Sequence, residues 1–270
     1  MLEVINASKT FAKGTPNEHK ALDHLNLSLK EGEFVTILGS NGAGKSTLFN
    51  AICGNFLLDE GSVILDGKNI SYLPEHQRSA SIGRLFQDPM KGTAPNLTIE
   101  ENLALAYSKN TKGLFRFAIT KKDREMFCEA LKRFDMGLED RMKQPVGLLS
   151  GGQRQALTLL MATMVTPKIL LLDEHTAALD PATAEKVLHL TRQIVAERQI
   201  TCLMVTHNMH QALTLGNRTL MMNAGNIVLD VAGEERAAMS VDDLLEQFAL
   251  RAGKALDNDR ILFSKVETQE

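Results

Sequence analysis

Hydrophobic residues follow two different spacings along this chain. Between residues 1 and about 88, short apolar runs are separated by turn signals such as Glu31-Gly32-Glu33. Such runs predict β-strands, here at residues 2–7, 21–29, 34–38, 62–66 and 81–86. From residue 98 to 166 the apolar residues recur every three to four positions, which predicts helices. A capping box formed by Thr98 and Glu101 is expected to start one of these helices.

Strands return after residue 167 and are more apolar. The runs at 168–172 and 201–205 lack polar alternation, which is typical of parallel strands covered on both faces. Residues 181–198, between them, carry an apolar helical face, so this region predicts a strand, helix, strand unit with a right-handed crossover. The whole pattern predicts an α/β fold. We expect a last helix near residues 241–250 and mobile residues at the polar end of the chain.

The segment after the strand predicted at 34–38 has the composition of a phosphate-binding loop. It reads Gly39-Ser40-Asn41-Gly42-Ala43-Gly44-Lys45-Ser46-Thr47 and leads into an apolar helical pattern, the context that this motif requires. The glycines let backbone N–H groups approach a polyphosphate, and the helix start adds its positive dipole end. We expect Lys45 to reach the β- and γ-phosphates of ATP and Ser46 to ligate Mg²⁺. Thr47 is a weaker phosphate ligand, and a glycine-rich turn is the competing interpretation.

Two carboxylates follow the apolar run at 169–172. Ligands of open parallel sheets bind at the carboxyl ends of the strands, where Asp173 and Glu174 would lie. We expect Asp173 to hold Mg²⁺ directly or through water, and Glu174 to polarise the water that attacks the γ-phosphate. Alone, this pair could equally be a solvated strand end. The phosphate loop earlier in the chain argues against that alternative.

Residues 149–153 form a second phosphate-directed motif, Leu149-Ser150-Gly151-Gly152-Gln153. Serine followed three residues later by glutamine is a capping-box pattern, and most such patterns only start helices. Here two glycines would expose the N–H groups of the helix start to an anion. One nucleotide does not need two separate cradles from one chain. We therefore expect this second cradle to serve the nucleotide bound by another copy.

Composition narrows the function classes further. The 270 residues are 44% hydrophobic and carry a net charge of −3, which is ordinary for a globular protein and disfavours direct nucleic-acid binding. Cys53, Cys128 and Cys202 lie far apart, so we expect reduced, mostly buried thiols in a cytosolic protein. No signal peptide is evident, and the apolar stretches are too short to cross a bilayer. Any work at a membrane would need another chain to span it.

These motifs together resemble the nucleotide-binding subunit of an ATP-binding-cassette (ABC) transporter, over residues 1 to about 250. The resemblance implies a P-loop NTPase (RecA-like) core with an antiparallel β subdomain, at 1–88 and 168–232. It implies an inserted α-helical subdomain carrying the signature motif at 89–167, and a C-terminal helix and tail at 233–270. It also implies two subunits paired head to tail, with two ATP molecules between phosphate loop and signature.

The resemblance assigns further roles to single residues. Gln87 corresponds to the Q-loop, which contacts magnesium or the attacking water and communicates with the membrane subunits. Asp180 corresponds to the D-loop and would report the occupancy of the partner, although Asp180-Pro181 is also a good helix start. His207 corresponds to the switch histidine that contacts the γ-phosphate. Phe11 falls where an aromatic ring stacks on adenine, with a core aromatic as the alternative.

The chain departs from the family pattern at two places. His175 stands where Pro is usual, and Met161-Ala162-Thr163 replaces a common Ala-Arg-Ala segment. These departures, with residues 86–103, resemble bacterial importer ATPases associated with amino-acid-like substrates. A basic, apolar segment at 109–124 is interpreted either as a membrane- or permease-facing surface or as a solvated helix face.

We therefore expect an ATP hydrolase at the inner face of the cell membrane. Its expected partners are a second copy or a paralogous ATPase subunit, transmembrane permease subunits, and an extracytoplasmic solute-binding protein. Import is favoured over export because exporters more often carry membrane and nucleotide domains in one chain. Two rivals remain: a soluble mechanochemical ATPase acting on nucleic acid or ribosomes, and a metabolic phosphate-loop kinase. The first usually has coiled coils or a second cassette, and the second would lack the signature motif.

Overall fold

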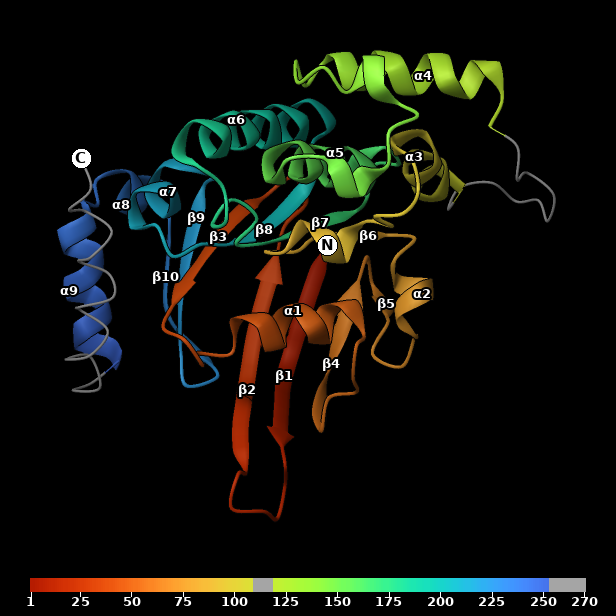
Figure 1. Ribbon diagram of the computed structural model, residues 1–270. Helices are drawn as coiled ribbons and strands as arrows, with labels where there is room; N and C mark the ends of the chain where they lie inside the picture. The colour runs from red at the N-terminus through yellow and green to blue at the C-terminus, as the bar shows by residue number, and fades with distance from the viewer. Residues whose placement is uncertain (109–118, 253–270) are drawn as a thin grey trace. The chain divides into compact units, whose positions relative to one another are not determined.

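The computed structural model describes residues 1–108 and 119–252, which belong to two compact units (Figure 1). The first unit is formed by Met1–Ser79 with Thr201–Glu270, and the second by Ala80–Ile200. From the sequence we expect subdomain boundaries at 88/89, 167/168 and 232/233, and these boundaries remain a prediction. Residues 109–118 of the predicted basic segment and residues 253–270 of the predicted tail lie outside the described residues.

The first unit contains an antiparallel sheet with the strand order β2-β1-β4-β5. Its strands are β1 (Leu2–Phe11), β2 (His19–Leu29), β4 (Glu60–Leu65) and β5 (Lys68–Asn69). Leu25, Leu27 and Leu29 of β2 are buried and alternate with exposed residues, as expected for a strand with one covered face. Figure 1 shows β1, β2 and β4 side by side, with helix α1 (Lys45–Cys53) in front of them.

A second group of strands in the first unit has the order β10-β9-β3-β8. Strand β3 (Phe34–Gly39) pairs in parallel with both β8 (Thr201–Val205) and β9 (Arg218–Asn223). Every residue of β3 and β8 is buried, which explains why these sequences lack polar alternation. Strand β10 (Asn226–Ala232) pairs antiparallel with β9. The phosphate-loop segment therefore begins at the end of a buried central strand.

Four short or medium helices complete the first unit: α2 (Glu75–Arg78), α7 (Met209–Thr214), α8 (Gly233–Ala237) and α9 (Val241–Ala252). Helix α9, drawn in blue in Figure 1, packs beside β10 and buries Leu244 and Phe248 against Leu229 and Val231. The guanidinium of Arg78 is buried and donates to the carbonyls of Ala51 and Ile52. These bonds satisfy carbonyl groups at the C-terminal end of α1, which would otherwise have no partner within the helix.

The second unit is mainly helical. Strand β6 (Ile82–Leu85) pairs in parallel with β7 (Ile169–Asp173). Helix α5 (Gly151–Thr163) contacts α3 (Ile99–Ser108), α4 (Lys121–Lys132) and α6 (Pro181–Arg198), as Figure 1 illustrates. The 3-10 turns η1 (Pro89–Gly92), η2 (Glu139–Arg141) and η3 (Val146–Leu148) connect these elements.

The local predictions are confirmed where hydrogen bonds decide them. Thr98 Oγ1 accepts from the backbone N–H of Glu101, and Glu101 Oε2 accepts from the backbone N–H of Thr98, so the predicted capping box is present. The helix predicted at 181–198 spans those residues. Cys53 and Cys202 are buried, Cys128 is half-buried, and none of the three forms a disulfide. None of the helices in the described part of the chain is long and apolar enough to cross a membrane.

Candidate functional site

The predicted phosphate loop connects the end of β3 to the start of α1. Its three glycines, Gly39, Gly42 and Gly44, have φ angles of 153°, 82° and 102°, which L side chains rarely adopt. A Cβ at Gly39 would lie 2.4 Å from the carbonyl oxygen of Met222, and one at Gly44 would lie 2.5 Å from that of Ala21. The space around Gly42 is open, so its φ angle is the reason for glycine there.

The side chain of Lys45 folds back over this loop. Its Nζ donates to the carbonyl oxygens of Gly39 at 2.6 Å and Ser40 at 2.9 Å, and the residue is 6% exposed. No side chain caps α1 at Gly44, so the first turn of α1 offers its N–H groups without a competing serine or aspartate acceptor. Ser46 is exposed on this turn and Thr47 is half-buried. Such a loop can bind phosphate oxygens through N–H groups and one ammonium.

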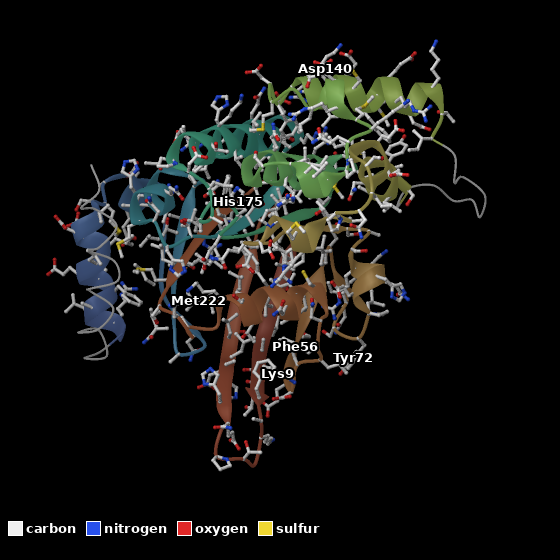
Figure 2. All side chains as sticks on the ribbon, viewed as in Figure 1. Lys9, Phe56, Tyr72, Asp140, His175 and Met222 are labelled. Carbon is white, nitrogen blue, oxygen red and sulfur yellow. The ribbon has the colours of Figure 1, made fainter. Side chains whose placement is uncertain are left out.

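An aromatic and charged cluster surrounds the predicted adenine contact, Phe11. The rings of Phe11 and Phe56 meet edge to face with centroids 5.4 Å apart, and Lys9 Nζ lies 5.7 Å and 5.3 Å from these two centroids. Figure 2 shows the labelled Lys9 and Phe56 close together. Lys9 Nζ also forms an ion pair with Asp59 at 2.9 Å. Phe11 is 39% exposed, so the alternative of a core aromatic does not hold.

His207 lies in the connection between β8 and α7. Its neighbour Asn208 caps α7 by accepting from the backbone N–H of Gln211 at 2.9 Å, and Thr206 Oγ1 accepts from the N–H of Asn208. These bonds fix the backbone on both sides of His207, whose side chain is half-buried. The first unit thus contains Phe11, the phosphate loop and His207 of the predicted site.

The second unit places Asp173 at the end of β7. Nη2 of Arg84, on the neighbouring strand β6, lies 3.2 Å from Oδ2 of Asp173, and the side chains are 11% and 14% exposed. The guanidinium carbon of Arg84 also lies 4.6 Å from the ring centroid of Phe86. Arg84 and Phe86 line a cavity of about 300 Å³. Arg84 was not predicted as a site residue, although a charged residue within an otherwise apolar strand is a signal visible in the sequence.

Glu174 follows Asp173 with a φ of 47°, in the left-handed region that non-glycine residues rarely occupy. Its carbonyl accepts from the backbone N–H of Ala177 at 3.0 Å, which closes a turn. His175 is buried, and burial lowers its pKa to about 4. Its Nε2 lies 3.3 Å from Oγ1 of Thr191 on α6. The histidine that departs from the family pattern therefore packs inside the second unit.

The signature segment forms the predicted capping box at the start of α5. Ser150 Oγ accepts from the backbone N–H of Gln153, and Gln153 Oε1 accepts from that of Ser150, both at 3.2 Å. Gly151 is exposed, with space for a Cβ at 3.5 Å from Leu179 Cδ2. A Cβ on Gly152 would lie only 2.0 Å from Cγ2 of Thr183. Gly152 is thus required by the packing of α5 on α6, a reason that the sequence did not reveal.

Asp180 lies at the start of α6, and Gln87 lies in the connection between β6 and η1. Asp180 caps α6 by accepting from the N–H of Thr183 at 3.0 Å, so the structural interpretation of Asp180-Pro181 is confirmed. Hydrogen bonds from Thr183 lower the pKa of Asp180. Gln87 is exposed two residues after the end of β6, next to Asp88, which caps η1. The second unit therefore contains Gln87, Asp173, Glu174, the signature segment and Asp180.

The predicted magnesium ligands are a hydroxyl, an amide and a carboxylate, on Ser46, Gln87 and Asp173. Oxygen atoms of these kinds are what Mg²⁺ prefers, and it commonly binds through one or two carboxylates plus substrate phosphates. Within residues 1–108 and 119–252, no three His, Cys, Asp or Glu side chains gather as a possible metal site. By their chemistry alone, these three predicted donors fit a magnesium ion that is held partly by a nucleotide.

A glycine-lined phosphate loop at the end of a buried parallel strand defines a nucleotide-binding protein of the phosphate-loop class. Comparison with known proteins specifies the family. A family model described as ABC transporter matches residues 22–177. The chain is 42% identical over 248 residues to the tyrosine transport ATP-binding protein of Clostridioides difficile, covering 92% of this chain and 98% of that protein. The phosphonates import ATP-binding protein PhnC 2 of Oceanobacillus iheyensis is 35% identical over 237 residues, covering 85% of this chain and 89% of that protein.

Solved structures agree with this assignment. The ATP-binding cassette MJ0796, in a dimeric post-hydrolysis state bound to ADP and Pi, matches with a TM-score of 0.74 and 32% identity, covering 86% of this chain and 98% of that chain. The ADP conformation of MJ1267, an ATP-binding cassette of an ABC transporter, matches with a TM-score of 0.73 and 27% identity, covering 99% of each chain. The chain belongs to the ABC transporter family, as an ATP-binding subunit of the ABC ATPase type. The predicted fold class is thereby confirmed.

Proposed function

We propose that this chain hydrolyses ATP to power the import of a small solute through separate membrane permease subunits. The observation that carries the proposal is the presence, in one chain, of a complete phosphate loop and an exposed glycine helix start at Ser150 and Gly151. A phosphate loop alone would serve many ATPases. The additional helix start supplies N–H groups and a hydroxyl for a second γ-phosphate, so two copies paired head to tail would complete two sites.

Each site residue receives a role in this proposal. Lys45 and the loop N–H groups hold the phosphates, and Phe11 stacks on the adenine. Glu174 orients and deprotonates the attacking water, while His207 contacts the γ-phosphate. Asp180 responds to the partner subunit, and Ser150 of the partner subunit contacts the same γ-phosphate.

Magnesium would be held by Ser46, Asp173 and Gln87 together with phosphate oxygens. When bound, the ion supplies positive charge that neutralises the phosphate oxygens during transfer. The protein contributes the positions of its oxygen donors, of which Asp173 is fixed at the end of a buried strand and paired with Arg84. Gln87, on the exposed segment after β6, would link the ion to contacts made by the permease.

The names of the relatives support the proposal of an importer and a proposal for the chemical class of its solute. The relative with 42% identity is named for tyrosine transport, and others are named for import of phosphonates, xylose and arabinose. We propose an amino-acid-like solute, in agreement with the resemblance noted at residues 86–103. The ATPase subunit would then act at the inner face of the membrane, bound to its permease.

Affinity purification of the tagged full-length chain from its native cells, in mild detergent, tests this function. We expect a hydrophobic permease to co-purify and to stimulate ATP hydrolysis, with specific ATPase activity rising steeply with protein concentration because two copies are needed. Binding to ribosomes or nucleic acid, with no membrane protein in the complex, would contradict the transport role. Transfer of phosphate to a small-molecule acceptor would instead identify a kinase.

A further inference from the structure

His175 is a buried polar residue that has no role in the proposed hydrolysis of ATP. Figure 2 shows it in the interior of its unit, below α6. It is 1% exposed, and its Nδ1 has no hydrogen-bond partner in the described part of the chain. Buried polar atoms nearly always have partners, so an imidazole with only one satisfied nitrogen requires an explanation. The hydrogen bond between its Nε2 and Thr191 indicates the role of the ring.

The tautomer of His175 follows from the bonds that Thr191 makes. Thr191 Oγ1 lies 2.8 Å from the carbonyl oxygen of Val187, one turn earlier in α6, and its single hydrogen is donated there. Toward His175 the hydroxyl can therefore only accept. Nε2 of His175, at 3.3 Å from Oγ1, must carry the hydrogen. In a neutral imidazole Nδ1 then carries no hydrogen.

This hydrogen bond joins the residue after Glu174 to the third turn of α6. Glu174 itself is held in the left-handed conformation, with a φ of 47°. A non-glycine residue keeps this conformation only where its surroundings enforce it. Two contacts next to Glu174 do so: the turn bond from the Ala177 N–H to its carbonyl, at 3.0 Å, and the anchoring of the His175 ring on Thr191.

The segment that follows His175 is also fixed at its C-terminal end, at Asp180. Asp180 caps α6, and the N–H of Leu179 donates to the carbonyl of Thr176 at 3.2 Å. The chain from Glu174 to Asp180 is therefore a short loop whose two ends are tied to the same helix. We propose that His175 is a positioning residue that sets the direction of the Glu174 carboxylate through the Nε2–H bond to Thr191. This inference rests on the proposed role of Glu174 in activating water.

His175→Leu and Thr191→Val test the proposal by removing the bond from either side. His175→Leu leaves no polar atom without a partner, since Thr191 Oγ1 keeps its bond to Val187. We expect unchanged or higher thermal stability together with a kcat for ATP lowered by about tenfold or more, because small misplacement of a reacting group is costly. The KM for ATP should stay within about twofold, since the phosphate contacts are untouched.

Conservative variants separate positioning from a merely structural role. Gln places its Nε2–H the same number of bonds from Cβ as His, so His175→Gln should restore kcat, whereas the shorter side chain of His175→Asn should not. Thr191→Ser keeps the hydroxyl and should be active, in contrast to Thr191→Val. His189→Gln, on the exposed face of α6, is the control and should behave as the wild-type protein.

The tautomer of His175 gives a readout that does not depend on the rate of hydrolysis. Selective ¹⁵N-histidine labelling of the 7 histidines, with His175→Gln for assignment, should show a neutral Nε2–H tautomer at position 175. An Nδ1–H tautomer would overturn the proposed bond. Wild-type kcat in both His175→Leu and Thr191→Val, with Glu174→Gln inactive, would refute the inference while leaving the proposed function intact. Normal hydrolysis by Glu174→Gln would instead refute the assignment of Glu174.

Discussion

Nη2 of Arg84 lies 3.2 Å from Oδ2 of Asp173, and both side chains are largely buried. The pair joins two parallel strands at the strand end where the predicted magnesium ligand is located. Burying either charge without the other would be expensive, because a desolvated ion needs a counter-charge. The orientation of Asp173 is therefore set in part by an arginine that belongs to none of the motifs found in the sequence.

A double-mutant cycle would measure this pair. Arg84→Met should lower the free energy of unfolding by about 1–3 kcal/mol, because the Asp173 carboxylate loses its ion pair with the Arg84 guanidinium. Asp173→Asn should have a similar cost, and the double variant should cost less than the sum of the two. Urea denaturation at pH 7 gives these values. Additive effects in the double variant would show that the two side chains do not interact in solution.

Unfolding stability should depend on the protonation of His175. Burial lowers its pKa to about 4 from an ordinary value of 6.5, so the unfolded chain binds this proton more readily than the folded one. The contribution of neutral His175 to the free energy of unfolding is fully present above pH 6.5. It is lost as the pH falls toward 4, and the total loss is about 3 kcal/mol. Urea titrations between pH 7 and pH 4 should show a steeper loss for the wild-type protein than for His175→Leu. Parallel curves for the two proteins would contradict the assignment.

The two signature glycines should respond differently to alanine. Gly152→Ala would place a Cβ 2.0 Å from Thr183 Cγ2. The free energy of unfolding should therefore fall by about 1–3 kcal/mol, because α5 would be overpacked against α6. Gly151→Ala has space for the added methyl and should fold normally. Its defect should appear only in ATP-dependent pairing and hydrolysis, because the methyl group would face the partner's nucleotide. Equal loss of stability in both variants would contradict this distinction.

Replacing Lys45 should weaken nucleotide binding. A charge-assisted hydrogen bond contributes about 1.5–3 kcal/mol, so the Kd for ATP should rise roughly ten- to a hundredfold in Lys45→Ala. Fluorescent nucleotide titration measures this Kd. Lys68→Ala, at an exposed lysine of β5, is the matched control and should bind as the wild-type protein does. An unchanged Kd in Lys45→Ala would remove this residue from the phosphate site.

Local sequence signals predicted the parts of the site that lie within one short segment. The phosphate loop, the capping boxes at Thr98 and Ser150 and the Asp180 cap each depend on neighbouring residues, and the structure shows the corresponding backbone. The strand positions around the loop were predictable because buried parallel strands are continuously apolar. These features need no knowledge of tertiary contacts.

Contacts between distant segments were not predictable in this way. Arg84 and Asp173 are separated by 89 positions, and only the pairing of β6 with β7 brings them together. The packing requirement at Gly152 depends on Thr183 of another helix, and the partnership of Phe11 with Phe56 depends on a loop after α1. In each case the residue types were visible in the sequence, but the register and packing that pair them were not.

In the proposed function, two copies close around ATP and Glu174 then drives hydrolysis. Glu174→Gln should slow hydrolysis by about 100-fold or more, since a general base contributes at least this factor, while leaving ATP binding intact. Glu185→Gln, an exposed charge-matched change on α6, is the control and should hydrolyse ATP normally. The decisive measurement is the molar mass of Glu174→Gln in solution by light scattering, with and without Mg-ATP. We expect a monomer without nucleotide and a dimer with it. A monomer under both conditions would refute the ATP-driven pairing, and normal hydrolysis would refute the role of Glu174.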